Sequence, residues 1–253
     1  MRRIILGLCA VALTSCDAGG GGPRADVPAG DVDMEETGAA AGVADESRGA
    51  PVAPVPPAME ETQNIVVVGT SLTAGYGIAA ELAYPAVLQA TIDSAGLPFE
   101  VVNAGISGET SAGGLRRIDW SLQQPVDVLI LELGANDGLR ALDPDAMRSN
   151  LDAILTRTKD RYPDADLLIL GMEAPPNLGQ VYTTRFRQVF REMARKHDAA
   201  LVPFLLEGVA GNPALNLDDG IHPSPEGHRI IARTVWAELG PILESRTGAA
   251  AVR

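Results

Sequence analysis

The sequence predicts an α/β domain, a three-layer α/β/α sandwich built on a five-stranded parallel sheet. Two observations support this fold class. Five apolar runs are continuous rather than alternating, as in strands that are buried on both faces. Helical stretches separate these runs, as in parallel sheets whose strands are joined by helices. We expect the strands at residues 65–68, 99–102, 126–133, 167–172 and 201–206.

The segments between the expected strands carry helix signals. Asp143-Pro144 and Ser224-Pro225 each begin a helix, with proline in the first position that it favours. Apolar side chains recur at helical spacing after both prolines and again across residues 181–197. We interpret these apolar stripes as core packing.

The amino-terminal region is expected to direct export. Met1-Arg2-Arg3 and the apolar run 4–13 are typical of a secretory signal, and the run is too short to span a bilayer. It ends in Leu13-Thr14-Ser15-Cys16, which resembles a bacterial lipobox, so we expect Cys16 to be lipidated. The alternative is an ordinary signal peptide cleaved nearby. The expected location is the cell envelope, on the periplasmic face of a membrane.

Residues 17–62 are rich in Gly, Ala and Pro and carry ten acidic and two basic residues. Such a segment buries too little apolar surface to offset its ordering entropy, so it is predicted to be a disordered tether. The folded domain is expected at 63–245, with a flexible tail at 246–253. Cys9 and Cys16 both precede the domain, which therefore depends on its hydrophobic core rather than on disulfides.

Charge and residue patterns exclude several functions. Residues 63–253 carry 23 acidic and 16 basic residues with no basic stripe, which argues against nucleic-acid binding. The same charge repels anionic lipid headgroups, so membrane attachment is expected only through the lipid on Cys16. No His/Cys cluster has metal-binding spacing, and we expect neither a metal nor another cofactor. We expect a monomer.

Candidate functional residues follow the ends of the expected strands, where parallel sheets place functional groups. Ser71 follows the first strand, Gly108 the second and Asn136 the third. Asp219 and His222 lie between the fifth strand and the last helix. A serine hydroxyl needs an imidazole to take its proton, and the imidazole needs an orienting acceptor. The sequence supplies all three groups, and only the three-residue spacing to the histidine selects Asp219 over Asp218.

Four segments resemble the signature blocks of the SGNH (GDSL-type) hydrolases. They are 69–77 (GTSLTAGYG), 103–110 (NAGISGET), 132–138 (ELGANDG) and 218–223 (DDGIHP). The resemblance covers about residues 64–245. It is strongest to the branch of the bacterial multifunctional thioesterase/protease I/lysophospholipase L1 and the arylesterases. It implies a flavodoxin-like fold and hydrolysis of aryl esters, short- to medium-chain acyl esters, thioesters or lysophospholipids.

The resemblance also implies a role for each residue. Ser71 would be the nucleophile, His222 the general base and then acid, and Asp219 the carboxylate that orients it. The oxyanion hole would comprise the backbone N–H groups of Ser71 and Gly108 and the side-chain amide of Asn136. A substrate-facing loop is expected at Ala174, Pro175, Pro176, Asn177 and Leu178.

One position departs from the family pattern, because Thr70 stands where an aspartate is usual. Threonine keeps a hydrogen-bonding oxygen but lacks the charge, so rate and pH optimum are the properties that this change affects. Two alternatives remain open at this stage. One is a carbohydrate O-deacetylase with the same triad, and the other is a surface binding lipoprotein without turnover. His197 and His228 are expected to be solvated or helix-terminal.

Overall fold

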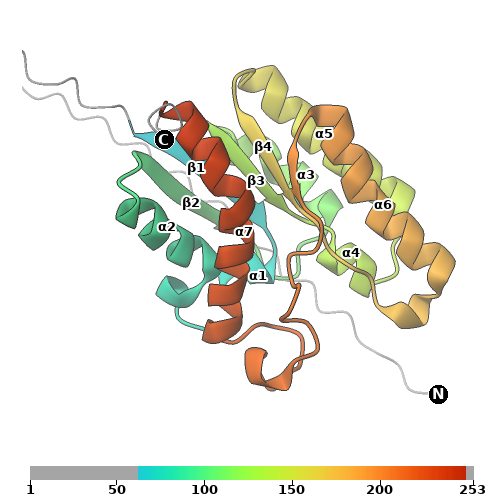
Figure 1. The fold of residues 1–253 in the computed structure, drawn as a ribbon. Coiled ribbons are helices and arrows are strands. Elements are labelled where there is room, and N and C mark those ends of the chain that lie inside the picture. Colours follow the sequence, from blue (N-terminus) through green and yellow to red (C-terminus); the bar gives the residue numbers. More distant parts are fainter. Residues whose placement is uncertain (1–61, 249–253) are drawn as a thin grey trace, which may run out of the picture. The chain divides into compact units, whose positions relative to one another are not determined.

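Five parallel strands form the sheet at the centre of the structure, in the order β2-β1-β3-β4-β5 (Figure 1). The computed structural model describes residues 62–248, so the predicted signal, Cys16 and the tether up to residue 61 lie outside the described residues. The strands are β1 (Gln63–Gly69), β2 (Phe99–Gly105), β3 (Val128–Glu132), β4 (Asp166–Leu170) and β5 (Ala200–Val202). The predicted five-stranded parallel sheet is confirmed.

Helices cover both faces of the sheet, which gives the predicted three layers (Figure 1). One face carries α2 (Tyr84–Ser94) and α7 (Pro225–Arg246), and the other carries α3 (Ser111–Ser121), α5 (Pro144–Arg161) and α6 (Gln180–His197). Two short helices, α1 (Ser71–Ala74) and α4 (Ala135–Leu139), follow β1 and β3. Single 3₁₀ turns lie at η1 (Ala80–Leu82), η2 (Pro176–Leu178) and η3 (Pro213–Leu215).

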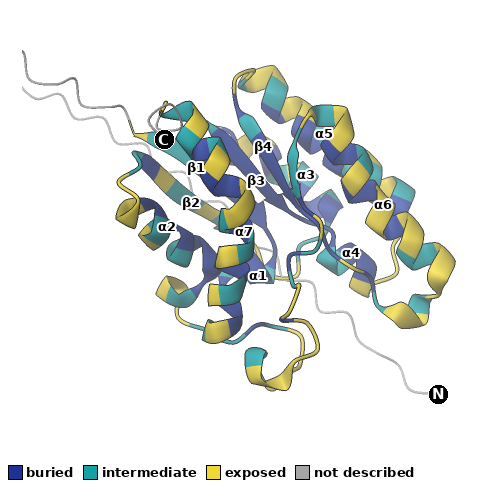
Figure 2. Cartoon of the chain, in the orientation of Figure 1, coloured by how far each residue is buried: buried dark blue, intermediate teal, exposed yellow. Residues whose placement is uncertain are grey.

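Burial separates the three inner strands from the two edge strands (Figure 2). Every residue of β3 is buried, whereas most residues of β2 are partly or fully exposed because β2 is paired on one side only. The expectation that all five strands are buried on both faces was therefore wrong for β2. It was also wrong for β5, the other edge strand, where only Val202 is buried. The expected fifth strand was too long, because Pro203 has no N–H to donate and β5 ends at Val202.

The carboxyl end of the domain is anchored by a charged side chain. Helix α7 continues to Arg246, where a flexible tail was expected to begin. Its guanidinium donates to the side chains of Gln63, Asp127 and Asp166 at 2.8–3.2 Å, which ties the helix end to the amino-terminal edge of the sheet. Within residues 62–248, none of the helices is both long enough and apolar enough to cross a bilayer.

Candidate active site

Ser71 and His222 come together at the carboxyl edge of the sheet, although 151 residues separate them in the chain. Ser71 is the first residue of α1, directly after the turn that ends β1. Its Oγ lies 3.0 Å from Nε2 of His222, and Nδ1 of the same ring lies 2.6 Å from Oδ2 of Asp219. The three predicted residues thus form a continuous hydrogen-bonded series.

The histidine loop is held mainly by its own hydrogen bonds. Oδ1 of Asp219 accepts from the backbone N–H groups of Ile221 and His222, each at 2.9 Å. The bond from the His222 N–H, followed by the bond from its ring, lowers the pKa of Asp219 to about 2. The carboxylate is therefore ionised at neutral pH and can only accept. Nδ1 must then carry the ring proton, which leaves Nε2 free to accept from the Ser71 hydroxyl.

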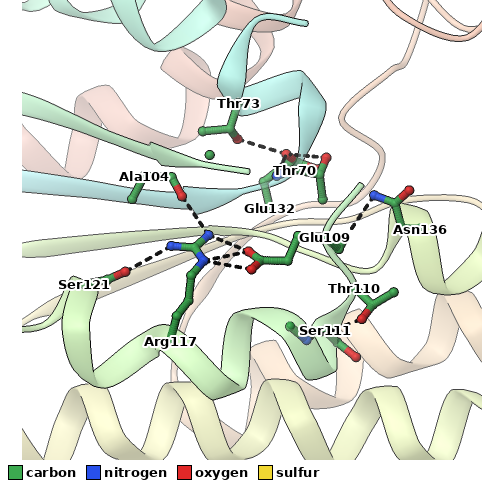
Figure 3. Close-up of polar contacts among 12 residues, drawn as sticks. Thr70, Thr73, Ala104, Glu109, Thr110, Ser111, Arg117, Ser121, Glu132 and Asn136 are labelled. Atoms are coloured by element: carbon green, nitrogen blue, oxygen red, sulfur yellow. Dashed lines mark hydrogen bonds and ion pairs between the residues drawn. The ribbon is translucent and has the colours of Figure 1, made fainter. Parts of the chain in front are cut away.

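The residues expected to form an oxyanion hole lie beside the serine. Gly108 and Asn136 line the same cavity as Ser71, and Gly108 has a φ of 78°, a backbone conformation that favours glycine. Nδ2 of Asn136 donates to the Glu109 carbonyl at 3.0 Å (Figure 3). A carboxamide has two N–H groups, so this bond fixes the side chain and leaves one donor for a substrate oxygen.

An ion pair supports the loop that carries Gly108 (Figure 3). Nε of Arg117 donates to both carboxylate oxygens of Glu109 at 2.8 and 2.9 Å, and Nη2 donates to the Ala104 carbonyl at 2.7 Å. Both side chains of the pair are mostly buried. A Cβ at Gly113 would lie 2.7 Å from the Glu109 side chain, so glycine makes room for the pair. Two-pronged contacts of this kind fix orientation as well as charge.

The cavity beside the serine has a volume of about 300 Å³ and is mainly apolar. Its apolar lining comes from Leu72, Tyr76, Leu139, Met172, Leu206 and Ile221. The Tyr76 ring lies 4.5 Å from the His222 ring between centroids, which covers one side of the imidazole. Such a lining favours a substrate with an acyl chain or an aromatic ring.

The predicted substrate loop lies outside this cavity. None of Ala174, Pro175, Pro176, Asn177 and Leu178 lines the cavity, and the chain after β4 contributes Met172 and Glu173 instead. Ala174 is buried in the hydrophobic core, and the partly buried Leu178 packs against that core. Pro176 and Asn177 between them are exposed, so the segment alternates between core and surface outside the cavity.

The other two histidines, which were expected to be solvated or helix-terminal, are both largely buried. His228 is buried, and its Nδ1 accepts from the Tyr84 N–H at 3.1 Å; burial, and secondarily His222, lowers its pKa to about 4. His197 is at the end of α6 as expected, but its mostly buried ring bonds Asp152 at 2.7 Å. Among residues 62–248, no group of three or more His, Cys, Asp or Glu side chains is arranged to hold a metal ion.

The fold and this site are those of a serine ester hydrolase. More specifically, the chain belongs to the GDSL-like lipase/acylhydrolase family, whose model matches residues 67–230. The resemblance to SGNH hydrolases and the prediction of a carboxylic ester hydrolase are confirmed.

Three similar proteins place the chain within the family. It is 40% identical over 182 residues to the esterase TesA of Pseudomonas aeruginosa, and the alignment covers 72% of this chain and 90% of TesA. It is 36% identical over 183 residues to an arylesterase of Vibrio mimicus, and this alignment covers 72% of this chain and 90% of the arylesterase. A crystal structure of the psychrotrophic esterase EstA from Pseudoalteromonas sp., inhibited by monoethylphosphonate, aligns with a TM-score of 0.67 at 32% identity. This alignment covers 72% of this chain and 99% of the EstA chain.

Proposed function

We propose that the protein hydrolyses carboxylic esters through an acyl intermediate on Ser71. The observation that carries the proposal is the series Ser71–His222–Asp219, joined at 3.0 and 2.6 Å on the wall of an apolar cavity. No cofactor takes part in this mechanism.

In the acylation step, the Ser71 hydroxyl attacks the ester carbonyl while Nε2 of His222 takes its proton. Negative charge develops on the carbonyl oxygen, and the N–H groups of Ser71, Gly108 and Asn136 are the proposed donors that stabilise it. The carbon–oxygen bond to the leaving group then breaks, and His222 returns the proton to the departing alcohol.

In the deacylation step, His222 takes a proton from water as the water attacks the acyl-enzyme. Collapse of the second tetrahedral intermediate breaks the bond to Ser71 Oγ, which regains its proton. Asp219 stays ionised throughout and stabilises the imidazolium that forms in each step.

The apolar cavity supports an acyl or aryl group as the part of the substrate that is recognised. Esters with aromatic alcohols or short to medium acyl chains fit this lining best, and thioesters and lysophospholipids carry the same acyl groups. A carbohydrate deacetylase would bind a polar sugar beside the serine, which these apolar side chains favour less. The O-deacetylase therefore stays the second candidate, and the hydrogen-bonded series Ser71–His222–Asp219 argues against a binding lipoprotein without turnover.

Hydrolysis of p-nitrophenyl esters from acetate to palmitate tests this proposal. We expect activity that rises beyond acetate, and loss of activity in Ser71→Ala. Leu139→Ala should lower kcat/KM for longer chains several-fold with little effect on acetate, because Leu139 lines the cavity. Leu142→Ala is a matched control, since this exposed leucine lies outside the cavity. Activity confined to acetate would favour the deacetylase.

We further propose that Cys16 carries the lipid that anchors the protein at the cell envelope. The lipobox-like sequence before Cys16 supports this, and the residue lies outside those that the structure describes. In fractionated host cells the native protein should be in the membrane fraction, and Cys16→Ala should release it. An unchanged distribution would contradict the anchor.

A further inference from the structure

A buried carboxylate lies beneath the turn that carries Ser71. Glu132 ends β3 and is fully buried. Oε2 accepts from the Thr70 N–H at 2.8 Å and from the Thr73 hydroxyl at 2.9 Å, and the Thr70 hydroxyl lies 3.0 Å from both carboxylate oxygens (Figure 3). All these donors come from the two residues that flank Ser71-Leu72.

The hydrogen bonds continue from the serine turn to the helix that follows the histidine loop. The Thr73 hydroxyl has one proton, and donating it to ionised Glu132 leaves its oxygen to accept from the Tyr84 hydroxyl at 2.8 Å. The Tyr84 N–H donates to Nδ1 of His228, in the first turns of α7. Through Tyr84, these buried contacts link β3 and the serine turn to His228 in α7, six residues after His222.

Thr70 gives this network its particular chemistry. It precedes α1, but its hydroxyl bonds Glu132 instead of capping the helix. An aspartate here would place two buried carboxylates in contact, and such a pair must share a proton. Threonine always supplies a proton to the contact, so Glu132 is a single carboxylate with neutral donors.

We propose that Glu132 is a positioning residue, which fixes the Ser71 turn relative to His222 when it is ionised and holds Thr70 as its donor. Glu132 does not line the cavity, so it acts through the turn and not on the substrate. The inference rests on the proposed function of Ser71 and His222. It adds that protonation of Glu132, a group outside the triad, slows the reaction.

The surroundings of Glu132 support titration near neutral pH. Burial raises its pKa to about 7, against the hydrogen bonds from Thr70 and Thr73. On the α2 side, Glu132 faces Tyr84. Burial, and secondarily the charge of Glu132, raises the pKa of Tyr84 well above its ordinary value. The turn contributes only hydroxyls and N–H groups, while on the α3 side Arg117 is paired with Glu109.

The first test is Glu132→Gln in the full-length protein. We expect kcat to fall roughly 10- to 100-fold with KM nearly unchanged, because a small displacement of a nucleophile costs about that much. The acid limb of log kcat/KM against pH should have a slope of two in the native protein and one in the variant. Native kcat together with an unchanged two-proton limb would overturn the inference.

Stability separates a positioning role from structural damage. A raised pKa means that the folded state binds more protons than the unfolded state between about pH 4.5 and 7. The native protein should therefore lose stability as pH rises through this window, and Glu132→Gln should lack that loss. The difference in thermal midpoint, variant minus native, should therefore increase as the pH is raised from 5 to 9. The kcat of the variant should stay low over the same range. A constant difference in midpoint would contradict the account.

Thr70→Val tests the donor. Removal of the hydroxyl should raise the pKa of Glu132 and move the acid limb to higher pH, and Thr70→Ser should restore it. Combined with Glu132→Gln, Thr70→Val should add no further loss, since both act on one contact. Thr158→Val is the matched control, because this buried hydroxyl bonds only the Ile154 carbonyl on α5.

The two levels of the account fail differently. An active Ser71→Ala would overturn the proposed function, and this inference with it. An inactive Ser71→Ala with native-like Glu132→Gln and Thr70→Val would overturn only the role of Glu132.

Discussion

The two sides of the proposed active site are held in different ways. On the serine side, the turn rests on a buried carboxylate, and a Cβ at Gly69 would lie 2.0 Å from a threonine hydroxyl. On the histidine side, the Asp219 side chain is 39% exposed, and a Cβ at Gly220 would meet nothing within 4 Å. The core therefore sets the position of the nucleophile, whereas hydrogen bonds within an exposed loop set the position of the base.

This difference suits the two roles. The serine oxygen must stay aligned with the proposed oxyanion donors, which lie on short helices and a loop at the same edge of the sheet. The imidazole exchanges protons with the serine, the leaving group and water, and so benefits from an accessible loop. Variants on the two sides should therefore fail in different ways.

The largest effect is expected for Ser71→Ala. Loss of the nucleophile should lower kcat by roughly 10⁴-fold or more while the thermal midpoint stays native-like. Ser107 also lines the cavity, so Ser107→Ala is the matched control and should keep most of the activity. Ester hydrolysis and thermal unfolding of both variants make the check, and comparable losses would contradict the assignment.

Asn136→Ala should have the next largest effect. Removal of one oxyanion donor typically lowers kcat by roughly 10²–10³-fold, and KM should change much less. Asn150→Ala serves as the control, because this carboxamide on α5 bonds the Ser111 hydroxyl and lies outside the cavity. An Asn136→Ala enzyme with raised KM and native kcat would mean that Asn136 binds the ground state instead.

Two glycine substitutions compare the sides directly. Gly69→Ala should cost about 3 kcal/mol and most of the activity, because the added methyl overlaps Thr73 and Glu132. Gly220→Ala should cost about 1 kcal/mol, since its φ of 68° strains alanine but the surrounding space is open. Urea unfolding gives both values. Equal costs would show that the core does not constrain the serine turn more tightly.

The smallest effect concerns pH and the link between the two sides. The pKa of His228 is lowered to about 4, so the unfolded state binds more protons between about pH 6.5 and 4. Stability from this buried neutral ring is present above pH 6.5 and lost as pH falls toward 4. His228→Asn, which keeps an acceptor for the Tyr84 N–H, should lose less stability between pH 7 and 5 than the native protein. Parallel thermal midpoints at both pH values would contradict this.

Local pattern predicted the strands and the three residues of the proposed triad. Continuous apolar runs predicted β1, β3 and β4. Ser71, Asp219 and His222 lie after strand ends or in short motifs that are recognisable in the sequence. The predictions for β2 and β5 were less accurate, because sequence alone does not tell which strands lie at the edges of a sheet.

The supporting contacts were not predictable in the same way. Glu132 meets Thr70 across 62 residues, and both appeared only as members of separate motifs. The ion pair between Glu109 and Arg117 depends on how α3 packs against its preceding loop. A glutamate at the end of an apolar strand is the signal that could have indicated such a network, since a buried charge requires partners.

Covalent labelling with a fluorophosphonate tests the central claim most directly. The reagent phosphonylates an activated serine, and peptide mass spectrometry locates the adduct. We predict one adduct on Ser71, none in Ser71→Ala and much slower labelling in His222→Ala. An adduct on Ser107, or equal labelling after loss of His222, would contradict the proposed mechanism.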